Sequence, residues 1–274
     1  MGAELVSKNS IEFQVFIISW RGQESNARHI ETSLADVCDD VTVIHATLGA
    51  EPHTVPSHWI KLPVFGYGKV FAKTLDLSGG MTMMHIQSDV SASDWPLLLE
   101  KFKVASRSQP NMGLWSPLVH GTSWTLDRTR MDQRQKTGSS LHRVTTVDGI
   151  VWALGDPVVR RLKQFQFEEN PLGWGIDIAA ASICHSSGLG VFLDESVRVT
   201  HPRGSGYGHE LAAAQAATFF GQLSETEMFF RLWIAAVAKE RIAKEKKSLP
   251  YRLRKLGRRI TRVLVDPIYR RVMR

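Results

Sequence analysis

Residues 83–91 read MMHIQSDVS, a short apolar run that stops on a polar turn. The length of the run, Met83–Gln87, and its lack of helical spacing favour a buried strand. Asp89 follows directly after the strand, between Ser88 and Val90. In open α/β sheets, ligands bind beyond the carboxyl ends of the strands. The stretch therefore predicts a sheet and places a carboxylate where its ligand site would lie.

Strand and helix patterns alternate on both sides of this stretch. The predicted strands of the first hundred residues are 13–20, 41–45, 59–62 and 83–87, and the predicted helices are 25–37, 68–77 and 94–105. The last of these helices has Ser93 or Asp94 as its N-cap and Pro96 in its first turn. Such alternation predicts an α/β fold, with a mostly parallel sheet covered by helices on both faces.

The second half of the chain is less regular. Its predicted strands are 113–118, 143–147, 190–193 and 197–200, its predicted helices are 156–164, 176–186, 209–220 and 224–247, and residues 128–141 are predicted to form a loop. Only helical patterns occur after Glu210. We therefore predict a catalytic domain over 1–208 and a helical C-terminal extension over 209–274.

Composition places the chain among soluble globular proteins. With 274 residues, 43% hydrophobic and 22% charged, it can bury a full core, and wholesale disorder is excluded. Its two cysteines, Cys38 and Cys184, lie in apolar surroundings and favour reduced thiols in a cytosolic compartment. No run approaches the roughly 18 consecutive apolar residues that span a bilayer. We therefore expect a cytoplasmic protein.

The net charge of +7 is unevenly distributed. Residues 239–274 hold 14 Lys and Arg against three Asp and Glu, whereas residues 1–238 hold 20 against 24. A basic groove across the main body is therefore not expected, which argues against nucleic acid as a partner. The excess of Lys and Arg lies in the C-terminal segment, 239–274.

That basic segment, 239–274, ends in a second pattern. From 253 to 272, apolar residues recur at helical spacing and arginines fill much of the other face, with a break at Asp266-Pro267. One interpretation is an amphipathic helix on an anionic membrane surface, at the inner face of the membrane. The others are a helix packed on the body and an RNA- or partner-binding tail. The membrane interpretation is slightly favoured over packing.

Asp89 itself has two interpretations. Beside Ser88 and Ser91, its carboxylate offers the hard oxygen ligands that hold Mg²⁺ or Mn²⁺ together with a diphosphate. Alternatively, Asp89 or Ser91 caps the helix that begins near residue 94. The residues alone leave both open.

Two later segments also carry reactive groups. Asp177 closes the string GWGID (173–177) at a predicted helix start, where it is either a general base for a hydroxyl nucleophile or a partner of the helix dipole. His201 opens the glycine-rich turn HPRGSGYG (201–208) after a strand. Its imidazole is either a ligand of the same metal or an incidental surface group, and Arg203 adds a cation for a diphosphate leaving group.

Taken in order, these motifs have a family likeness. The strand-end Asp89, the segment VDGIVWAL (147–154), the GWGID string and the strand-end His201 resemble the inverting GT-A glycosyltransferases of the family-2 kind. The resemblance covers roughly residues 13–208. It implies a GT-A-type (nucleotide-diphospho-sugar transferase) fold, a nucleotide-sugar donor and a divalent metal, Mn²⁺ or Mg²⁺. The second strand ends in His45 rather than an acid, so the nucleotide is not specified.

The resemblance also implies roles for single residues. Asp177 would be the catalytic base in a single in-line displacement. The metal would be held by Asp89, Ser91 and His201. Donor and diphosphate contacts would come from Ser19, Arg21, Lys69, Asp89, Ser91, Arg203 and Tyr207. The acceptor and sugar pocket would be lined by Asp148, Gly149, Trp174 and Gly175.

The expected function is therefore transfer of a sugar to a hydroxyl acceptor, with a glycan or lipid-linked acceptor in bacterial cell-surface polysaccharide or glycolipid synthesis. Two alternatives stay open. A nucleotidyltransferase shares the alternating sheet and the strand-end acid, although Trp20-Arg21-Gly22 is a poor version of its glycine-rich loop. A non-catalytic, membrane-associated adaptor would keep the fold and use only the tail.

Overall fold

A computed structural model describes residues 12–47, 55–64, 66–131, 140–202 and 208–247. The chain divides into two units, Met1–Ile234 and Ala235–Arg274. The predicted amphipathic tail beyond residue 247 lies outside the described residues, as do Arg203 and Tyr207.

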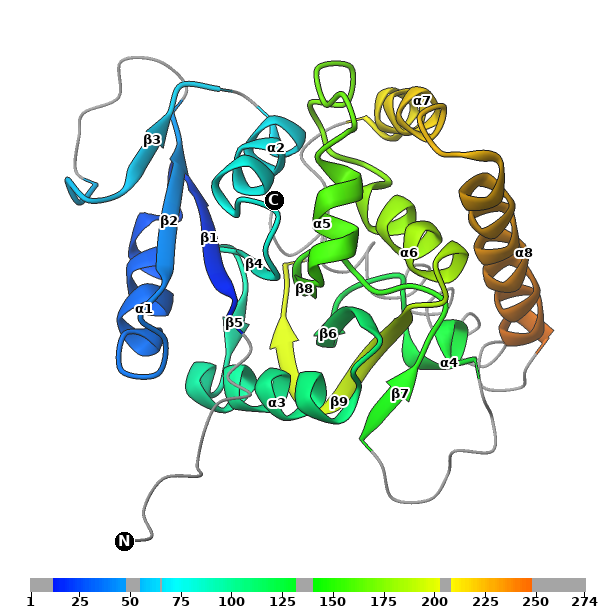
Figure 1. Cartoon of the computed structure of the whole chain (residues 1–274), viewed down its shortest axis with the longest axis horizontal. Coiled ribbons are helices and arrows are strands. Elements are labelled where there is room, and N and C mark those ends of the chain that lie inside the picture. Colours follow the sequence, from blue (N-terminus) through cyan, green and yellow to red (C-terminus); the bar gives the residue numbers. More distant parts are fainter. Residues whose placement is uncertain (1–11, 48–54, 65, 132–139, 203–207, 248–274) are drawn as a thin grey trace, which may run out of the picture. The chain divides into compact units, whose positions relative to one another are not determined.

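The first half of the larger unit alternates strands and helices, as the sequence predicts (Figure 1). Its elements are β1 (Gln14–Trp20), α1 (Glu24–Leu34), β2 (Val41–Ala46), β3 (Ile60–Leu62), α2 (Tyr67–Leu77), β4 (Met83–Gln87), β5 (Ser91–Ala92) and α3 (Trp95–Ser108). The side chain of Asp94 caps α3 by accepting a hydrogen bond from the Leu97 amide at 2.8 Å. Pro96 stands in the first turn, where its missing N–H leaves no bond unmade.

The second half begins with the long strand β6 and ends in helices. Its elements are β6 (Met112–His120), α4 (Leu126–Thr129), β7 (Leu141–Arg143), β8 (Val151–Leu154), α5 (Asp156–Leu162), α6 (Ile176–Ser186), β9 (Gly190–Thr200), α7 (His209–Phe220) and α8 (Glu225–Lys247). Two predicted short strands, 190–193 and 197–200, are one continuous strand, β9. The strand predicted at 143–147 lies earlier, as β7.

The strands of the described residues form one mixed sheet in the order β3-β2-β1-β4-β8-β6-β9-β5, with β7 also paired to β9. Its first four strands are parallel. The strand β8 runs antiparallel to both β4 and β6, and β6 is parallel to β9. The carboxyl ends of β1, β4, β6 and β9 and the amino end of β8 therefore meet at one edge of the sheet.

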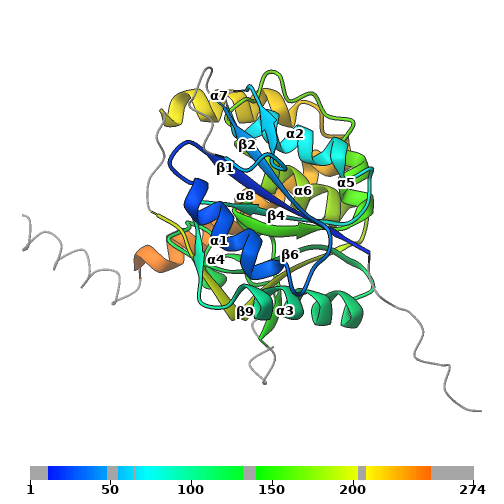
Figure 2. The same ribbon diagram turned by 90° about the vertical axis from the view of Figure 1, so that its left-hand side faces the viewer.

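Helices cover both faces of the sheet, as predicted, and each face has its own apolar core (Figure 2). One core is closed by α1 and α3, which bury Ile30 and Phe102. The other is closed by α2, α5, α6 and α7. There, Phe71 of α2 stacks on Trp152 of β8, with ring centroids 5.6 Å apart. Burial of aromatic and branched side chains on both faces is the main stabilisation of such a sheet.

The helix α7 is part of the larger unit. Its Phe219 packs against Phe165 and Phe167, with ring centroids 5.2 and 5.1 Å apart. The division found in the structure, after Ile234, therefore falls later in the chain than the predicted boundary after residue 208. The helical extension as a separate domain stays a prediction.

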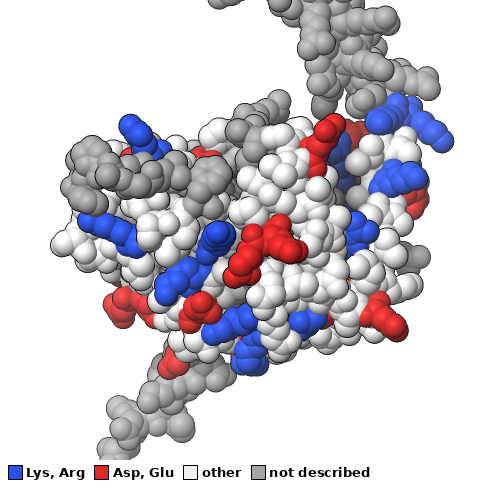
Figure 3. All heavy atoms as spheres, turned by 90° about the horizontal axis from the view of Figure 1, so that it is seen from above, with Lys and Arg blue, Asp and Glu red and all other residues white. Residues whose placement is uncertain are grey.

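One face of the molecule carries charge of both signs. On the face drawn in Figure 3, Lys and Arg side chains are interspersed with Asp and Glu. Within the described part of the chain, the helices include none that is both long and apolar enough to cross a membrane.

Candidate functional site

The strand directions bring Asp89 and His201 together. Asp89 follows β4, and His201 follows β9. The short strand β5 then pairs antiparallel with the end of β9, with Ser91 opposite Thr200. This pairing fixes the chain after Asp89 beside the residue before His201. The result is a direct contact, with Nε2 of His201 3.1 Å from Oδ2 of Asp89.

Both partners of this contact are mostly shielded from solvent. The side chain of Asp89 is 19% exposed and that of His201 is 18% exposed. The hydrogen bond to Asp89 raises the pKa of His201, against the opposing effect of burial. The other carboxylate oxygen, Oδ1 of Asp89, is buried without a hydrogen-bond partner among the described residues. A buried oxygen of this kind is costly unless something else binds it.

The turn that carries Asp89 is held from α1. The side-chain amide of Asn26 donates to the carbonyl oxygens of Ser88 and Val90, the latter at 2.8 Å. The Ser88 amide donates to the Ile18 carbonyl of β1 at 2.9 Å. The backbone on both sides of Asp89 is therefore fixed, which restricts where its carboxylate can point.

A second pair of carboxyl groups lies at the same edge. Asp148 and Gly149 precede β8, and Asp177 stands in the first turn of α6. A Cβ atom placed on Gly149 would lie 3.5 Å from Cβ of Asp177, so the two segments pass in close contact. Asp148 is tied down by Thr122, whose hydroxyl donates to its Oδ2.

The surroundings raise the pKa of both carboxyl groups. Burial and the neighbouring charge of Asp148 raise the pKa of Asp177 to about 7. Hydrogen bonds from the Ile178 amide, at 2.8 Å, and from Trp124 oppose this shift without cancelling it. Burial likewise raises the pKa of Asp148, although Thr122 and His201 pull it down. An acid poised near 7 is a typical signature of a functional site.

The glycine-flanked tryptophan leads into α6. Gly175 adopts a left-handed conformation, with φ of +83°, as the residue before the helix. Trp174 is half-buried, and its indole lies against His209 of α7, with ring centroids 5.5 Å apart. Asn170 donates to the Trp174 carbonyl at 3.0 Å and fixes the loop. The predicted pocket residues of this segment therefore border Asp177.

The structure places the remaining predicted donor residues differently. Ser19 is fully buried, and its hydroxyl lies 3.1 Å from Nδ1 of His45 in the interior. Arg21 is exposed in the turn after β1, Lys69 is exposed in the first turn of α2, and Ser91 is exposed on β5. No contact links these three side chains to the cluster within the described chain. Their donor-binding roles, like the metal role of Ser91, stay predictions.

Several residues of the site have no role in the sequence analysis: Asn26, Tyr67, Gln87, Thr122 and Trp124. Two signals were available. Thr122 and Trp124 follow a predicted strand, so they belong to the same edge once the directions are known. Tyr67 is flanked by Gly66 and Gly68, the pattern that drew attention to Trp174.

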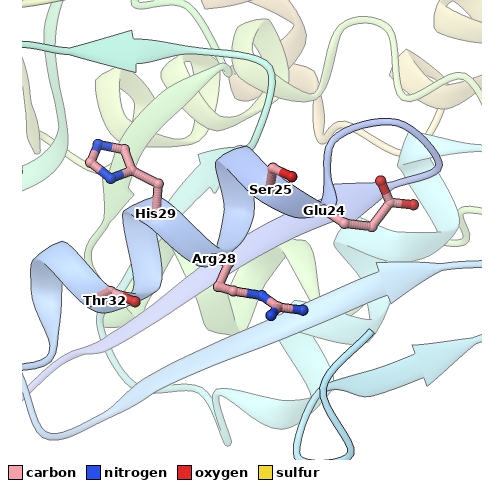
Figure 4. Close-up of a pocket in the computed structure, with 5 residues that line it drawn as sticks. All are labelled: Glu24, Ser25, Arg28, His29 and Thr32. Atoms are coloured by element: carbon pink, nitrogen blue, oxygen red, sulfur yellow. The ribbon is translucent and has the colours of Figure 1, made fainter. Parts of the chain in front are cut away.

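Two hollows in the described surface lie away from this cluster. One, of about 590 Å³, is lined by side chains of α1, including Arg28 and His29 (Figure 4). A smaller one, of about 190 Å³, lies at the opposite edge of the sheet, beside Thr82 and Gly155. Three or more His, Cys, Asp or Glu side chains do not converge on a metal-binding point anywhere in the described ranges. The cluster of Asp89, Asp148, Asp177 and His201 is therefore defined by its contacts and charges.

The architecture is that of the GT-A-type, nucleotide-diphospho-sugar transferase fold: a mixed, largely parallel sheet flanked by helices. Comparison with protein-family models finds no match, and comparison with curated proteins finds none either. Among solved structures, the chain is similar to GalNAc-T7, crystallised with UDP, GalNAc and Mn²⁺, at a TM-score of 0.62 and 12% identity. That match covers 93% of this chain and 58% of GalNAc-T7. A putative glucose-1-phosphate thymidylyltransferase from Bacillus anthracis, in complex with a sucrose, matches at a TM-score of 0.42 and 13% identity, over 79% of this chain and 99% of that one.

Proposed function

We propose that this chain is a nucleotide-sugar-dependent glycosyltransferase that acts by a single inverting displacement. One observation carries the proposal. At the carboxyl edge of a GT-A-type sheet, Asp177 combines shielding from solvent, a neighbouring carboxylate and a pKa raised to about 7. A base with that pKa is half-ionised near neutral pH and can accept a proton from a hydroxyl as the bond to carbon forms.

The proposed step is balanced by groups on the chain and the donor. Asp177 takes the proton of the acceptor hydroxyl while that oxygen bonds to the anomeric carbon. The bond from the same carbon to the diphosphate oxygen breaks, and the nucleoside diphosphate leaves with the electron pair. Asp148, hydrogen-bonded to Thr122, lies close enough to Asp177 to raise its basicity. Attack from the face opposite the leaving group inverts the anomeric centre.

Asp89 and His201 fit a divalent cation only in part. They supply one oxygen and one nitrogen ligand, and the unpartnered Oδ1 of Asp89 is an atom that a cation would satisfy. Mg²⁺ and Mn²⁺ accept small protein ligand sets when diphosphate oxygens and water complete the shell. When bound, such an ion would neutralise charge on the departing diphosphate. His201 would have to turn from Asp89 toward it, since the two now contact each other.

The test is the variant Asp177→Asn in a transfer assay with UDP-, GDP- and dTDP-sugars plus Mn²⁺. We expect kcat to fall by about 10³-fold, within the usual range for loss of a general base. Donor affinity should stay within about twofold of wild type, measured by calorimetry, because the amide keeps the shape of the side chain. The product should have the anomeric configuration opposite to that of the donor.

Asp76→Asn is the matched control, since Asp76 is exposed near the end of α2. It should leave kcat unchanged. Retention of configuration, or full activity of Asp177→Asn, would exclude Asp177 as the base. Formation of a nucleotide-sugar from a nucleoside triphosphate and a sugar 1-phosphate would favour a nucleotidyltransferase instead. Failure to bind any of the donors would favour the adaptor.

We further propose that the acceptor is a glycan or lipid-linked molecule at the inner face of a membrane. The support is the charge of residues 239–274, with 14 Lys and Arg against three acids. Each cation near an anionic bilayer contributes about 1 kcal/mol. The full chain should co-sediment with vesicles of phosphatidylcholine and phosphatidylserine, but not with phosphatidylcholine alone, and 0.5 M salt should release it. Equal sedimentation with both vesicles would contradict the proposal.

A further inference from the structure

Tyr67 lies at the centre of the site although it is not one of its acids. It is the first residue of α2. Its hydroxyl donates to the carbonyl oxygen of Gly149 at 3.0 Å. The side-chain amide of Gln87, at the end of β4, donates to the same oxygen at 3.3 Å. Two donors from two separate elements therefore hold one peptide, the one between Gly149 and Ile150, which begins one residue after Asp148.

The ring of Tyr67 is seated between two other site segments. A Cβ atom on Gly173 would lie 2.3 Å from the Tyr67 ring, so only glycine fits at that point of the loop before α6. On its other side the ring meets His85 of β4 edge to face, with centroids 5.3 Å apart. The backbone is equally constrained: the Gly68 amide donates to the Pro171 carbonyl at 2.9 Å. Tyr67 thus has little freedom to move.

Gly149, the residue held by Tyr67, is the point of contact between the two acidic segments. It lies beside Asp177, and a substituent on its Cα would approach the Asp177 side chain at 3.5 Å. Burial, together with the nearby charges of Asp177 and Asp148, raises the pKa of the Tyr67 phenol far above its usual range. The phenol therefore stays protonated and remains a hydrogen-bond donor.

From these contacts we infer that Tyr67, helped by Gln87, is a positioning residue that holds the Gly149 peptide and so fixes the distance between Asp148 and Asp177. Loss of the phenol hydroxyl frees the Asp148–Gly149 segment to move away from Asp177. The separation of the two carboxyl groups then widens, and their mutual repulsion weakens. The inference rests on the proposed function of Asp177 as the base, but the geometry it describes does not.

Among the described residues, four titratable groups bear on the contact between Tyr67, Gly149 and Asp177: Asp148, His201, Asp89 and His85. Asp148 faces Asp177 from the segment before β8, and His201 acts on Asp148 from the end of β9, where Asp89 holds it. Tyr67 approaches both acids from α2. Beneath the phenol, His85 of β4 is fully buried, and its burial lowers its pKa to about 3, so it is neutral at working pH. Movement of Asp148 is therefore the main way in which a change at Tyr67 reaches Asp177.

The test is Tyr67→Phe in the full-length chain, since the variant keeps the ring and removes only the hydroxyl. We expect kcat to fall about tenfold with the donor KM unchanged. The acid limb of the kcat/KM profile should also shift to lower pH, because Asp177 loses part of the repulsion that keeps it protonated. Carboxyl ¹³C NMR should show the same decrease in the pKa of Asp177 without any substrate.

Thr74→Val is the matched control, because Thr74 is a buried hydroxyl of the same helix that donates only to the Phe71 carbonyl at 2.6 Å. It should leave both profiles at their wild-type positions. An unchanged Asp177 pKa in Tyr67→Phe, or an equal shift in Thr74→Val, overturns the inference. The NMR measurement needs no turnover. If the wild type transfers no sugar while the NMR shift is present, the proposed function fails and the positioning role stands.

Discussion

Two regions of the molecule shield carboxyl groups from water and shift their pKa values in opposite directions. Where α5 meets α8, Glu227 is 6% exposed and accepts hydrogen bonds from Nε and Nη2 of Arg161, each at 2.9 Å. At the carboxyl edge of the sheet, Asp177 instead faces a second acid, Asp148. Burial alone would raise the pKa of Glu227, but Arg161 and Ser224 outweigh it and lower that pKa. For Asp177, burial and its neighbour act in the same direction.

The opposite pKa shifts distinguish Glu227, a carboxylate that joins two helices, from Asp177, a carboxyl group that can accept or release a proton. A buried charge is tolerated when its partner and its hydrogen bonds are complete, as they are at Glu227. A buried acid without such a partner destabilises the fold when it ionises, and it persists only where something other than stability maintains it. This contrast, rather than burial alone, supports the proposed role of Asp177 as a base and a structural role for Glu227.

The largest effect on stability is expected from breaking the ion pair between Arg161 and Glu227. Glu227→Gln removes the charge that pairs with Arg161 and leaves a single amide oxygen to accept from it, beside the Gln222 carbonyl, at 3.0 Å, and the Gln164 side chain. Removing one partner of a buried pair typically costs about 3 kcal/mol. We expect the free energy of unfolding at pH 7 to fall by that amount, measured by urea denaturation. Because folding lowers the pKa of Glu227, its stabilisation is present above about pH 4.5 and is lost as the pH falls through the folded value.

Arg160→Gln is the control for this change. Arg160, one residue earlier in α5, pairs with Asp156 at 3.0 Å, but both side chains are about half exposed. Exposed pairs contribute under about 1 kcal/mol, so the control should differ little from wild type. Folded Glu227→Gln should keep wild-type kcat. A drop in kcat that exceeds its loss of folded protein would place Glu227 within the functional region and remove the contrast.

The sequence predicts much of the fold because its local signals are strong. The Ala-rich run Ile176–Ser186 is predicted as a helix and is observed as α6, and of the two predicted caps of α3, Ser93 and Asp94, the structure has Asp94. The strand β8 was missed because Val151–Leu154 is a four-residue apolar run, which periodicity does not separate from a helix or loop. The mixed directions of the sheet depend on long-range pairing of β8 with β4 and β6, which no local pattern encodes.

The residues of the candidate site are likewise predictable from the sequence only in part. Strand-end position is enough to select Asp89 and His201 as candidate site residues, and the structure places them in contact. Ser19 is predicted to contact the donor, but side chains alternate across a strand, and its side chain is buried beside His45. The glycines that flank Tyr67 mark it as a candidate, but they do not reveal what it contacts. Its partner, Gly149, is 82 residues away, and only the folded chain joins them.

The smaller of the two effects on stability should come from Asp177→Asn, which removes the repulsion between Asp177 and Asp148. Between the ordinary aspartate pKa near 4 and the folded value of about 7, the folded chain holds a proton that the unfolded chain has released. Wild-type stability therefore falls as the pH rises through this range, opposite in sign to the contribution of Glu227. The asparagine variant lacks this loss, so its gain over wild type should grow from pH 5 to pH 8, to on the order of 2 kcal/mol. Urea denaturation at both pH values measures it. A gain that is equal at pH 5 and pH 8 would mean that packing, not the charge facing Asp148, distinguishes this carboxyl group from Glu227.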